Sequence, residues 1–540
     1  CRRGLLRPQR YVTDIVTFTQ EFRLRGSNGA MDWLVGAFYY DESIYFESDI
    51  DFGSQWRNYA NILVGGSPAA GEAVIGGLEA LLGYPTGTFF EPGTGVLEMA
   101  TMDNETMSVF GQASFDLTSR TQLTLGFNYL DDEKDVGIAQ VNDDIFSKLA
   151  LDGADGATAL TNAGFLGAYP GAFEATFGLP FTPDNAALVG STPAGAAGMQ
   201  QLQAGVLGQV AAAVAMADLS DPTQNPFVGL QALQFLPQML EVPNAANNGA
   251  SADEKFTYTA SISHDFSDQL NVYLTYATGY KATSWNLSRD TRPTQGEYDA
   301  LVSAGVTLPN NLTIGTRLAG PEESEVLELG IKYKAPWGYI NAAFFNQTIE
   351  GFQSNVFTGA GFNLANAGEQ SVDGVEVDVM LRPTERLSLG VSGTYLDPFY
   401  DAFIGANVGG AASDLSGTKP GGIPELTLSL IGSYDFTILG WDAWIQADYR
   451  YDKEVDIQDG GDQSESNILL ETTNSRTREV GLLNASVGIA KNGWEFRVWG
   501  RNLTNDEYLI TWFPSVAQTG SFSGYPNQPR MWGASIRKSF

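Results

Sequence analysis

The chain ends in Pro529-Arg530-Met531-Trp532-Gly533-Ala534-Ser535-Ile536-Arg537-Lys538-Ser539-Phe540, and this segment carries the clearest structural signal of the sequence. From Trp532 onward, apolar or long-stemmed side chains alternate with small and polar ones. A period of two places successive side chains on opposite faces of a β-strand. A soluble protein seldom stops within a strand on an aromatic residue, whereas the last strand of an outer-membrane barrel pairs with the first and removes both sheet edges. The ending therefore predicts a transmembrane β-barrel.

Composition fits this prediction and excludes other classes of protein. The chain has 63 acidic and 30 basic residues, a formal net charge of −33, so it lacks the excess of Lys and Arg that non-specific nucleic acid binding needs. Aromatic residues make up 12%, which argues against an acidic disordered chain. No run of about 18 apolar residues predicts a membrane helix, but barrel strands need only every second residue to be apolar.

Alternating segments follow one another in pairs, joined by short polar turns and separated by long irregular stretches. In the first pair, Asp14–Arg25 and Met31–Glu47 flank Gly26-Ser27-Asn28-Gly29, a strong hairpin signal. The other predicted pairs are Glu105–Leu117 with Thr121–Asp132, Lys255–Phe266 with Leu270–Tyr280, Glu325–Tyr333 with Tyr339–Ile349, Val372–Leu381 with Leu387–Leu396, Pro424–Phe436 with Trp441–Tyr451, and Val480–Ala490 with Trp494–Leu503. With the last strand, this predicts an all-β, transmembrane antiparallel β-barrel portion of about 15 strands, with short periplasmic turns and long extracellular loops that carry short helices.

The two faces of these strands differ in chemistry. In Trp494–Arg501, Phe496 and Val498 share an apolar face and alternate with charged residues. We expect the apolar face to meet lipid and the polar face to line the lumen. A soluble sandwich with one wet face is the alternative, which the strand lengths, the one-sided loops and the lack of a second covering layer disfavour. The charged residues predicted to face the lumen are Asp448, Arg450, Glu495, Arg497 and Arg501.

Several motifs match one family in order. Asn502-Leu503-Thr504-Asn505-Asp506-Glu507-Tyr508, followed by Pro529-Arg530 and the final strand, resembles the C-terminal signature of TonB-dependent outer-membrane receptors. Other segments are similar to strands and loops of the same family, which extends the resemblance over Lys255–Phe540, with a weaker match over Thr17–Glu42. These segments are Tyr276-Ala277-Thr278-Gly279-Tyr280-Lys281, the Glu-Leu-Gly-Ile-Lys at 328–332, and Asn366-Ala367-Gly368 followed by Val372-Asp373-Gly374-Val375-Glu376.

The resemblance implies a 22-stranded barrel with a plugged lumen in the outer membrane of a Gram-negative bacterium. In this family the plug and the TonB-contacting segment precede the barrel, and no position of the sequence corresponds to either. We therefore expect residues 1–540 to be a partial receptor barrel. Cys1 allows two interpretations, a lipidated first residue or a truncated chain, and truncation is favoured because the strand pattern begins near Asp14.

The function that the resemblance implies is active uptake of a scarce, large ligand, most often a ferric siderophore. The implied partners are outer-membrane lipid, the TonB complex through the N-terminal region, and an extracellular small-molecule ligand. The charged lumen residues would then meet a polar plug, although any water-filled barrel needs a polar lumen. A passive outer-membrane channel or a surface-binding barrel without energy coupling is the alternative function.

The expected loops include one of unusual length. Residues 133–253 far exceed the roughly 12–15 residues of an ordinary loop and predict a large extracellular insertion. Within it, the apolar spacing of Met199–Leu219 predicts a surface helix, and Ala73–Leu82 in an earlier loop predicts a second one.

Candidate ligand contacts come from loop bases near the expected barrel mouth. Aromatic rings and Arg suit the chelating rings and negative charge of a siderophore, and girdle or loop-packing roles are the alternative. These candidates are Trp285, Asn286, Arg289, Tyr400, Trp512 and Phe513. A second group, Asp456, Asp459, Asp462 and Glu465, offers oxygen ligands for Ca²⁺. Its spacing matches no calcium-loop motif, so a solvated acidic loop tip is favoured and no metal is expected.

Catalysis has little support in the sequence. His264 is the only histidine and Cys1 the only cysteine, which leaves no Cys–His pair or multi-His metal site within the fold. Neither a Gly-x-Ser-x-Gly elbow nor a phosphate-binding loop occurs. We expect no enzyme and no cofactor, and an outer-membrane hydrolase would have to depend on His264.

Overall fold

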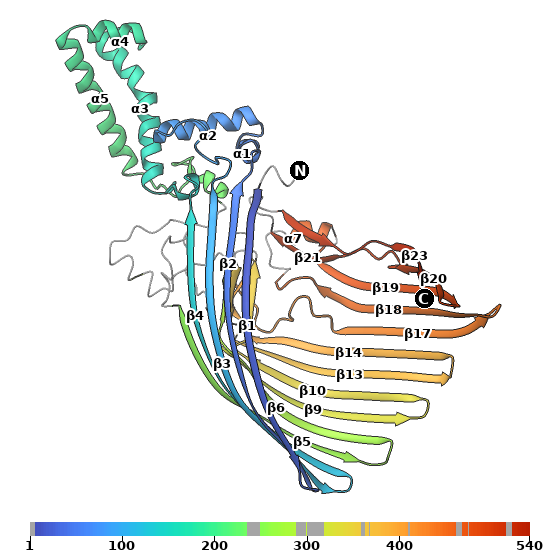
Figure 1. The fold of residues 1–540 in the computed structure, drawn as a ribbon. Helices are drawn as coiled ribbons and strands as arrows, with labels where there is room; N and C mark the ends of the chain where they lie inside the picture. Colours follow the sequence, from blue (N-terminus) through green and yellow to red (C-terminus); the bar gives the residue numbers. More distant parts are fainter. Residues whose placement is uncertain are drawn as a thin grey trace.

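A computed structural model of the chain shows one curved antiparallel sheet of 15 strands (Figure 1). It describes residues 6–234, 249–287, 299, 318–357, 362–366, 368–408, 411–460, 467–473, 475–514 and 521–540. Neighbouring strands of the sheet follow one another in chain order, as expected for a succession of hairpins. The strands are β1 (Leu6–Ser27), β2 (Met31–Phe52), β3 (Gly95–Thr118), β4 (Thr121–Asn142), β5 (Ala250–Asp265), β6 (Leu270–Lys281), β9 (Glu322–Ala335), β10 (Gly338–Glu350), β13 (Glu369–Thr384), β14 (Leu387–Ala402), β17 (Leu426–Ile438), β18 (Trp441–Asp456), β19 (Thr477–Lys491), β20 (Trp494–Arg501) and β23 (Met531–Lys538).

The short turns lie where the sequence predicts them. Between β19 and β20, Asn492 and Gly493 have φ angles of 50° and 78°, both in the left-handed region. Two such residues make a turn whose twist matches that of the flanking strands, and Asn-Gly is the favoured pair for it. The predicted hairpins are therefore confirmed, and this turn has the backbone conformation that its Asn-Gly pair favours.

Strands β1 to β4 are longer than predicted. They have 22 to 24 residues, whereas β5 has 16 and β20 has 8. The predicted ends at Glu47, Glu105 and Asp132 mark where apolar alternation stops, but the backbone ladder continues to Phe52, Gly95 and Asn142. The connections between these strands are therefore shorter than expected, at residues 53–94 and 143–249. The strands extend further because ladder hydrogen bonds join backbone groups and do not depend on apolar side chains.

Helices lie above the outer ends of β2, β3 and β4 (Figure 1). They are α1 (Trp56–Gly65), α2 (Pro68–Leu82), α3 (Ala154–Phe177), α4 (Pro183–Gly190) and α5 (Pro193–Val214), with 3-10 turns at Phe146–Lys148 and Val228–Leu233. Both predicted helices exist, but α5 begins six residues before Met199 and ends before Leu219. Thr192 caps its N-terminus by accepting a hydrogen bond from the Gly195 amide, and Pro193 occupies the first turn, which is a start signal that apolar spacing misses.

No described helix is long and apolar enough to cross a membrane.

Smaller elements extend the outer ends of other strand pairs. Among the described residues, four two-stranded ribbons lie in the connections between strand pairs, and α7 (Asn467–Thr472) lies between β18 and β19. The ribbons are β7 (Ser284–Trp285) with β8 (Leu318–Ala319), β11 (Gln353–Phe357) with β12 (Phe362–Asn366), β15 (Ile404–Val408) with β16 (Ala411–Asp414), and β21 (Leu509–Pro514) with β22 (Phe522–Pro526).

The main hydrophobic core lies above the sheet, where residues 53–94 meet residues 143–234. We refer to these two segments as the helical cap. Phe89, Phe90 and Phe146 are fully buried there, and the Phe90 and Phe146 rings are 4.5 Å apart. The two segments, which are separated in the chain by the β3–β4 hairpin, thus fold into one unit with its own core.

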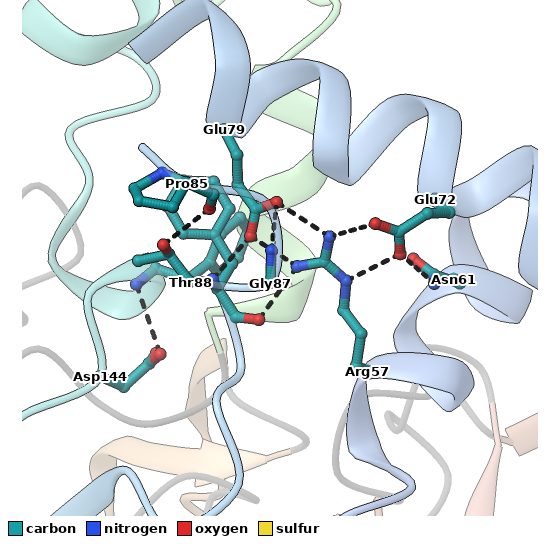
Figure 2. Close-up of polar contacts among 10 residues, drawn as sticks. Arg57, Asn61, Glu72, Glu79, Pro85, Gly87, Thr88 and Asp144 are labelled. Atoms are coloured by element: carbon teal, nitrogen blue, oxygen red, sulfur yellow. Dashed lines mark hydrogen bonds and ion pairs between the residues drawn. The ribbon is translucent and has the colours of Figure 1, made fainter. Parts of the chain in front are cut away.

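Arg57 anchors a polar network inside the helical cap (Figure 2). Its guanidinium donates to the carboxylate of Glu79 at 2.7 and 3.1 Å, to that of Glu72 at 2.8 and 3.0 Å, and to the Phe89 carbonyl at 3.0 Å. Glu79 is fully buried and also accepts hydrogen bonds from the backbone amides of Gly87 and Phe89. Each charged group in this network therefore contacts a group of opposite charge, as burial requires.

Candidate functional site

Strands β17, β18, β19, β20 and β23 of the large sheet present two chemically distinct faces. The register aligns Tyr434, Ile445, Val487, Val498 and Ala534 in one continuous row across the five strands. This row belongs to the apolar face, and Val498 is 52% exposed. The opposite face of the same strands carries polar and charged side chains. Exposed apolar residues on one face and polar residues on the other are what a barrel wall between lipid and a wet lumen needs.

A cavity of about 780 Å³ lies on the polar face of β18, β19, β20 and β23. Its charged lining residues are Asp448, Arg497 and Arg501, three of the five residues predicted to face the lumen. Its other lining residues include Asn484, Ser486, Trp499, Asn502, Tyr508 and Asn527.

Strand β20 contributes an Arg-Trp-Arg row to this cavity. Arg497, Trp499 and Arg501 alternate with the apolar-face residues of the strand, so their side chains leave the same face. The Trp499 ring lies close to Gly533 of β23, where an added Cβ would stand 2.8 Å from the ring. The guanidinium of Arg501 lies 5.7 Å from the centre of the Trp499 ring, within the range of a cation–π contact.

Asp448 and Arg497 make neutral rather than ionic contacts. Asp448 accepts a hydrogen bond of 2.7 Å from the side-chain amide of Asn484 on β19. Arg497 donates one of 3.0 Å to the hydroxyl of Ser486. The cavity therefore combines two guanidinium groups with one carboxylate, a positive surplus in a chain of net charge −33.

The roof of the cavity is built by the motif that begins at Asn502. Asn502 adopts φ 47° and ends β20, two residues before the predicted end at Leu503. Its backbone amide donates to the Asn484 side chain, and its own side chain bridges the Asp506 backbone and the Gln528 carbonyl. Asn tolerates this left-handed conformation better than most residues. The chain thus turns at the strand end and returns over the polar face.

Further hydrogen bonds hold this returning segment in place. The Asp506 carboxylate accepts from the Gly481 amide of β19 at 2.6 Å. The Asn527 side chain donates to the Asp506 carbonyl and accepts from the Tyr508 amide. Asn484, Asn502, Tyr508 and Asn527 were absent from the predicted site residues. For Asn502 and Tyr508 a signal exists in the Asn502–Tyr508 motif, which the sequence analysis uses only as a family signature, whereas Asn484 and Asn527 lie outside that motif.

The two remaining lumen predictions lie outside the cavity lining. Arg450 forms a two-hydrogen-bond ion pair with Asp452, at 2.7 and 3.0 Å. Glu495 lies on the same face of β20 as Arg497, opposite Arg537 of β23 in the register. Both are on the polar face, but neither lines the cavity.

The structure distributes the predicted ligand contacts over separate apolar clusters and does not gather them at one site. Trp285, Tyr400 and Trp512 are 9%, 3% and 3% exposed and belong to three different clusters. Asn286 is buried, and Phe513 is half-buried with its ring 6.0 Å from Tyr525. Arg289 lies outside the described residues. Their contact with a ligand stays a prediction, and in this conformation burial leaves the three rings little surface to offer one.

Tyr400, at the outer end of β14, links the β14–β17 segment to the β18–β19 segment. Its hydroxyl donates to Asp459 at 3.0 Å, and Asp459 also accepts from the Gly421 amide at 2.6 Å. Burial raises the pKa of the Asp459 carboxyl above its ordinary value, and burial together with the Asp459 charge raises the pKa of the Tyr400 hydroxyl. Gln458 then reaches the third connection by donating to Thr511 at 3.0 Å. The β14–β17, β18–β19 and β20–β23 connections are therefore interlocked, and we call them the interlocked loops.

The predicted acidic group does not form a metal site in the part of the chain that the structure describes. Asp459 is committed to Tyr400 and Gly421, and Asp456 forms an ion pair with Arg476 at 2.9 Å. Asp462 and Glu465 lie outside the described residues. Among the described His, Cys, Asp and Glu residues, no group of three or more is placed to hold a metal ion.

His264 lies at the inner end of β5, beside a short turn. Its Nδ1 is 2.9 Å from the Thr121 hydroxyl of β4, and its ring is 4.6 Å from that of Phe266. The Thr121 contact joins β4 to β5 and the Phe266 contact lies within one strand end, which is a structural role.

Comparison with known proteins identifies the fold. The chain aligns with the solved structures of the ferric yersiniabactin uptake receptor FyuA from Yersinia pestis (13% identity, TM-score 0.56, 98% of this chain and 54% of that one) and of the siderophore receptor PiuA from Acinetobacter baumannii (14%, 0.53, 97% and 56%). It also aligns with the closed form of the ferric-catecholate import receptor Fiu from E. coli K12 (13%, 0.50, 98% and 55%). No curated protein matches the sequence.

The chain spans about half the length of these solved receptors. At such low identity the alignments show a shared fold and carry no information about the ligand. The family model described as "TonB dependent receptor-like, beta-barrel" matches residues 4–503, nearly the whole chain. The members of this family are outer-membrane proteins of Gram-negative bacteria. The polar face of the sheet is accordingly the lumen wall, and the chain belongs to the TonB-dependent receptor β-barrel family.

Proposed function

We propose that the protein takes up a scarce, large ligand through the outer membrane with energy delivered by the TonB complex, and that the ligand is a ferric siderophore. The family supports the transport class. The solved receptors with the same fold include proteins named for siderophore and ferric-catecholate uptake, which supports the ligand class.

The observation that carries the proposal is the wet cavity on the lumen wall beneath interlocked outer loops. The connections beside this cavity are held together by Tyr400–Asp459 and Gln458–Thr511, so they offer an ordered outer surface next to a polar cavity, which suits capture of a large ligand. We propose transport and not catalysis as the activity.

Uptake by cells that produce the whole protein tests both parts of the proposal. Cells with and without the gene would be given ⁵⁵Fe complexes of catecholate, hydroxamate and carboxylate siderophores under iron limitation. We expect gene-dependent uptake of one class that a protonophore abolishes, because TonB draws on the inner-membrane proton gradient. Gene-dependent uptake that survives the protonophore would support the passive channel instead, and uptake of another solute class would correct the ligand.

A further inference from the structure

A groove crosses the apolar face in the middle of the large sheet. It has a volume of about 520 Å³ and is lined by residues of β6, β9, β10, β13 and β14, each of which pairs with a strand on both sides. The chain therefore contains every strand that shapes the groove. Tyr395 of β14 lies opposite Leu426 of β17, which shares a strand face with Tyr434 of the apolar row. The groove is thus part of the surface that faces lipid, outside the lumen.

The register explains why the surface is hollowed here. Phe344 of β10, Val375 of β13 and Tyr395 of β14 lie opposite one another. The two aromatic side chains are 46% and 49% exposed and flank the shorter valine, which forms the floor. In the next row toward the short turns, Val377 lies opposite Gly393, so this row carries small residues and the apolar surface continues in that direction.

The two ends of the groove differ in polarity. At the end nearer the outer connections, Asn346 lies opposite Asp373 and donates a hydrogen bond of 2.9 Å to its carboxylate. Both side chains are exposed. The exposed side chains that follow toward the short turns, Leu329 and Phe344 among them, are apolar. A lipid of the outer leaflet has the same direction, with its headgroup outward and its acyl chains toward the bilayer centre.

Charge decides which headgroup fits the polar end. A carboxylate can accept about four hydrogen bonds, and Asn346 supplies one to Asp373. Glu325 lies further out on the same face of β9 as Leu327, another lining residue, and adds a second exposed carboxylate. Acyl chains alone give little selectivity, because their surroundings are as apolar among other lipids as in the groove. The polar end therefore favours a headgroup with N–H or O–H donors over one that offers only acceptors.

We propose that this groove binds one lipid of the outer leaflet, with an acyl chain between Phe344 and Tyr395 and a hydrogen-bond donor of the headgroup on Asp373. The position of the lipid follows from the sheet register, and its direction follows from the polarity of the groove. The inference depends on the membrane location of the family and is independent of the transported ligand and of energy coupling.

Native mass spectrometry with two lipids tests the headgroup contact. The whole protein, purified from outer membranes and delipidated in detergent, would be titrated with phosphatidylethanolamine and with phosphatidylcholine. Both are zwitterions, but only the ethanolamine ammonium has N–H donors. We expect the wild type to retain phosphatidylethanolamine about tenfold better, since a hydrogen bond to a carboxylate is lost with choline. Asp373→Asn should remove most of this preference. No preference in the wild type, or an unchanged preference in the variant, would overturn the proposal.

Val375→Phe tests the groove itself, because it raises the floor between the two aromatic walls. Retention of phosphatidylethanolamine should fall about fivefold as acyl-chain contacts are lost. Phe344→Ala removes one wall and gives a second variant with the same expected loss. Val498→Phe, the matched change on the apolar face outside the groove, should retain the lipid as the wild type does. Equal retention in all of these proteins would overturn the proposal, and dimers that disappear in Val375→Phe would assign the groove to a second copy of the chain instead.

Discussion

Arg57 in the helical cap and Arg497 on the lumen wall carry the same charge in opposite surroundings. Arg57 donates five hydrogen bonds, four to Glu72 and Glu79 and one to the Phe89 carbonyl, inside the helical cap (Figure 2). Arg497 donates one, to Ser486, and lines a cavity. A buried charge must be paired, whereas a charge in a wet lumen can stay open. The difference separates a cation that stabilises a core from one that lines a polar cavity.

Glu79→Ala tests whether the buried ion pair with Arg57 stabilises the helical cap. It removes the fully buried partner of Arg57 and the acceptor for the Gly87 and Phe89 amides. Breaking a buried ion pair from one side costs about 3–5 kcal/mol, so amide hydrogen exchange in α1 and α2 should accelerate strongly. Glu72→Ala is the control, because that side chain is 40% exposed and its loss should cost about 1 kcal/mol. Equal effects of the two variants would show that burial of Glu79 is not what stabilises the cap.

The two faces of β20 can be tested by exchanging their chemistry. Val498→Arg places a charge on the membrane-facing row and should cost about 2–4 kcal/mol of folding free energy in lipid vesicles, measured by urea titration. Arg497→Val changes the lumen side of the same strand and should cost much less. If the valine variant is the less stable one, the assignment of lipid and lumen faces is wrong.

Tyr400→Phe tests the interlocked loops. The variant removes one hydrogen bond to Asp459, so we expect it to cost about 1 kcal/mol and to increase proteolysis of the outer connections. Because burial raises the folded-state pKa of Asp459, the folded loops bind its proton more tightly than the unfolded chain does. Their stability should therefore fall as the pH rises from the ordinary aspartate range through the raised pKa. Asp459→Asn should abolish this pH dependence, and a persistent dependence would assign it to another group.

The smallest expected effect on stability comes from the exposed ion pairs of Glu425 with Lys419 and Lys453. Hydrogen bonds from Lys419 and Lys453 lower the pKa of Glu425 to about 2. A lowered pKa stabilises the folded state above pH 4.5 or so and loses this contribution as the pH falls toward 2. Since Glu425 is partly exposed, the effect on stability should stay below about 1 kcal/mol and shrink in high salt. Thermal unfolding of the wild type and Glu425→Gln between pH 6 and 3 measures it, and identical acid profiles would exclude the network as a source of stability.

The strand pattern could be predicted because each strand carries its own signal. Alternation identified the pairs, Asn492-Gly493 specified a turn, and the faces of Trp494–Arg501 separated Val498 from Arg497. Alternation underestimates the length of strands that continue beyond the apolar band, as those ending at Phe52 and Asn142 do. There the strands are stabilised by backbone hydrogen bonds and by the helical cap. Alternation also failed at Asn502, whose φ of 47° ends β20 early.

The fold class, the order of the hairpins and the chemistry of each strand face can be predicted from the residues alone, because these depend on positions close together in the chain. The three-dimensional structure is needed to show which arginines are paired, where the lumen cavity lies, and that Trp285, Tyr400 and Trp512 are buried in separate clusters. These properties depend on partners from other strands, such as Asp459 for Tyr400 and Gly533 for Trp499. Pairing and burial are set by neighbours in space, and a periodic pattern along one strand carries no information about them.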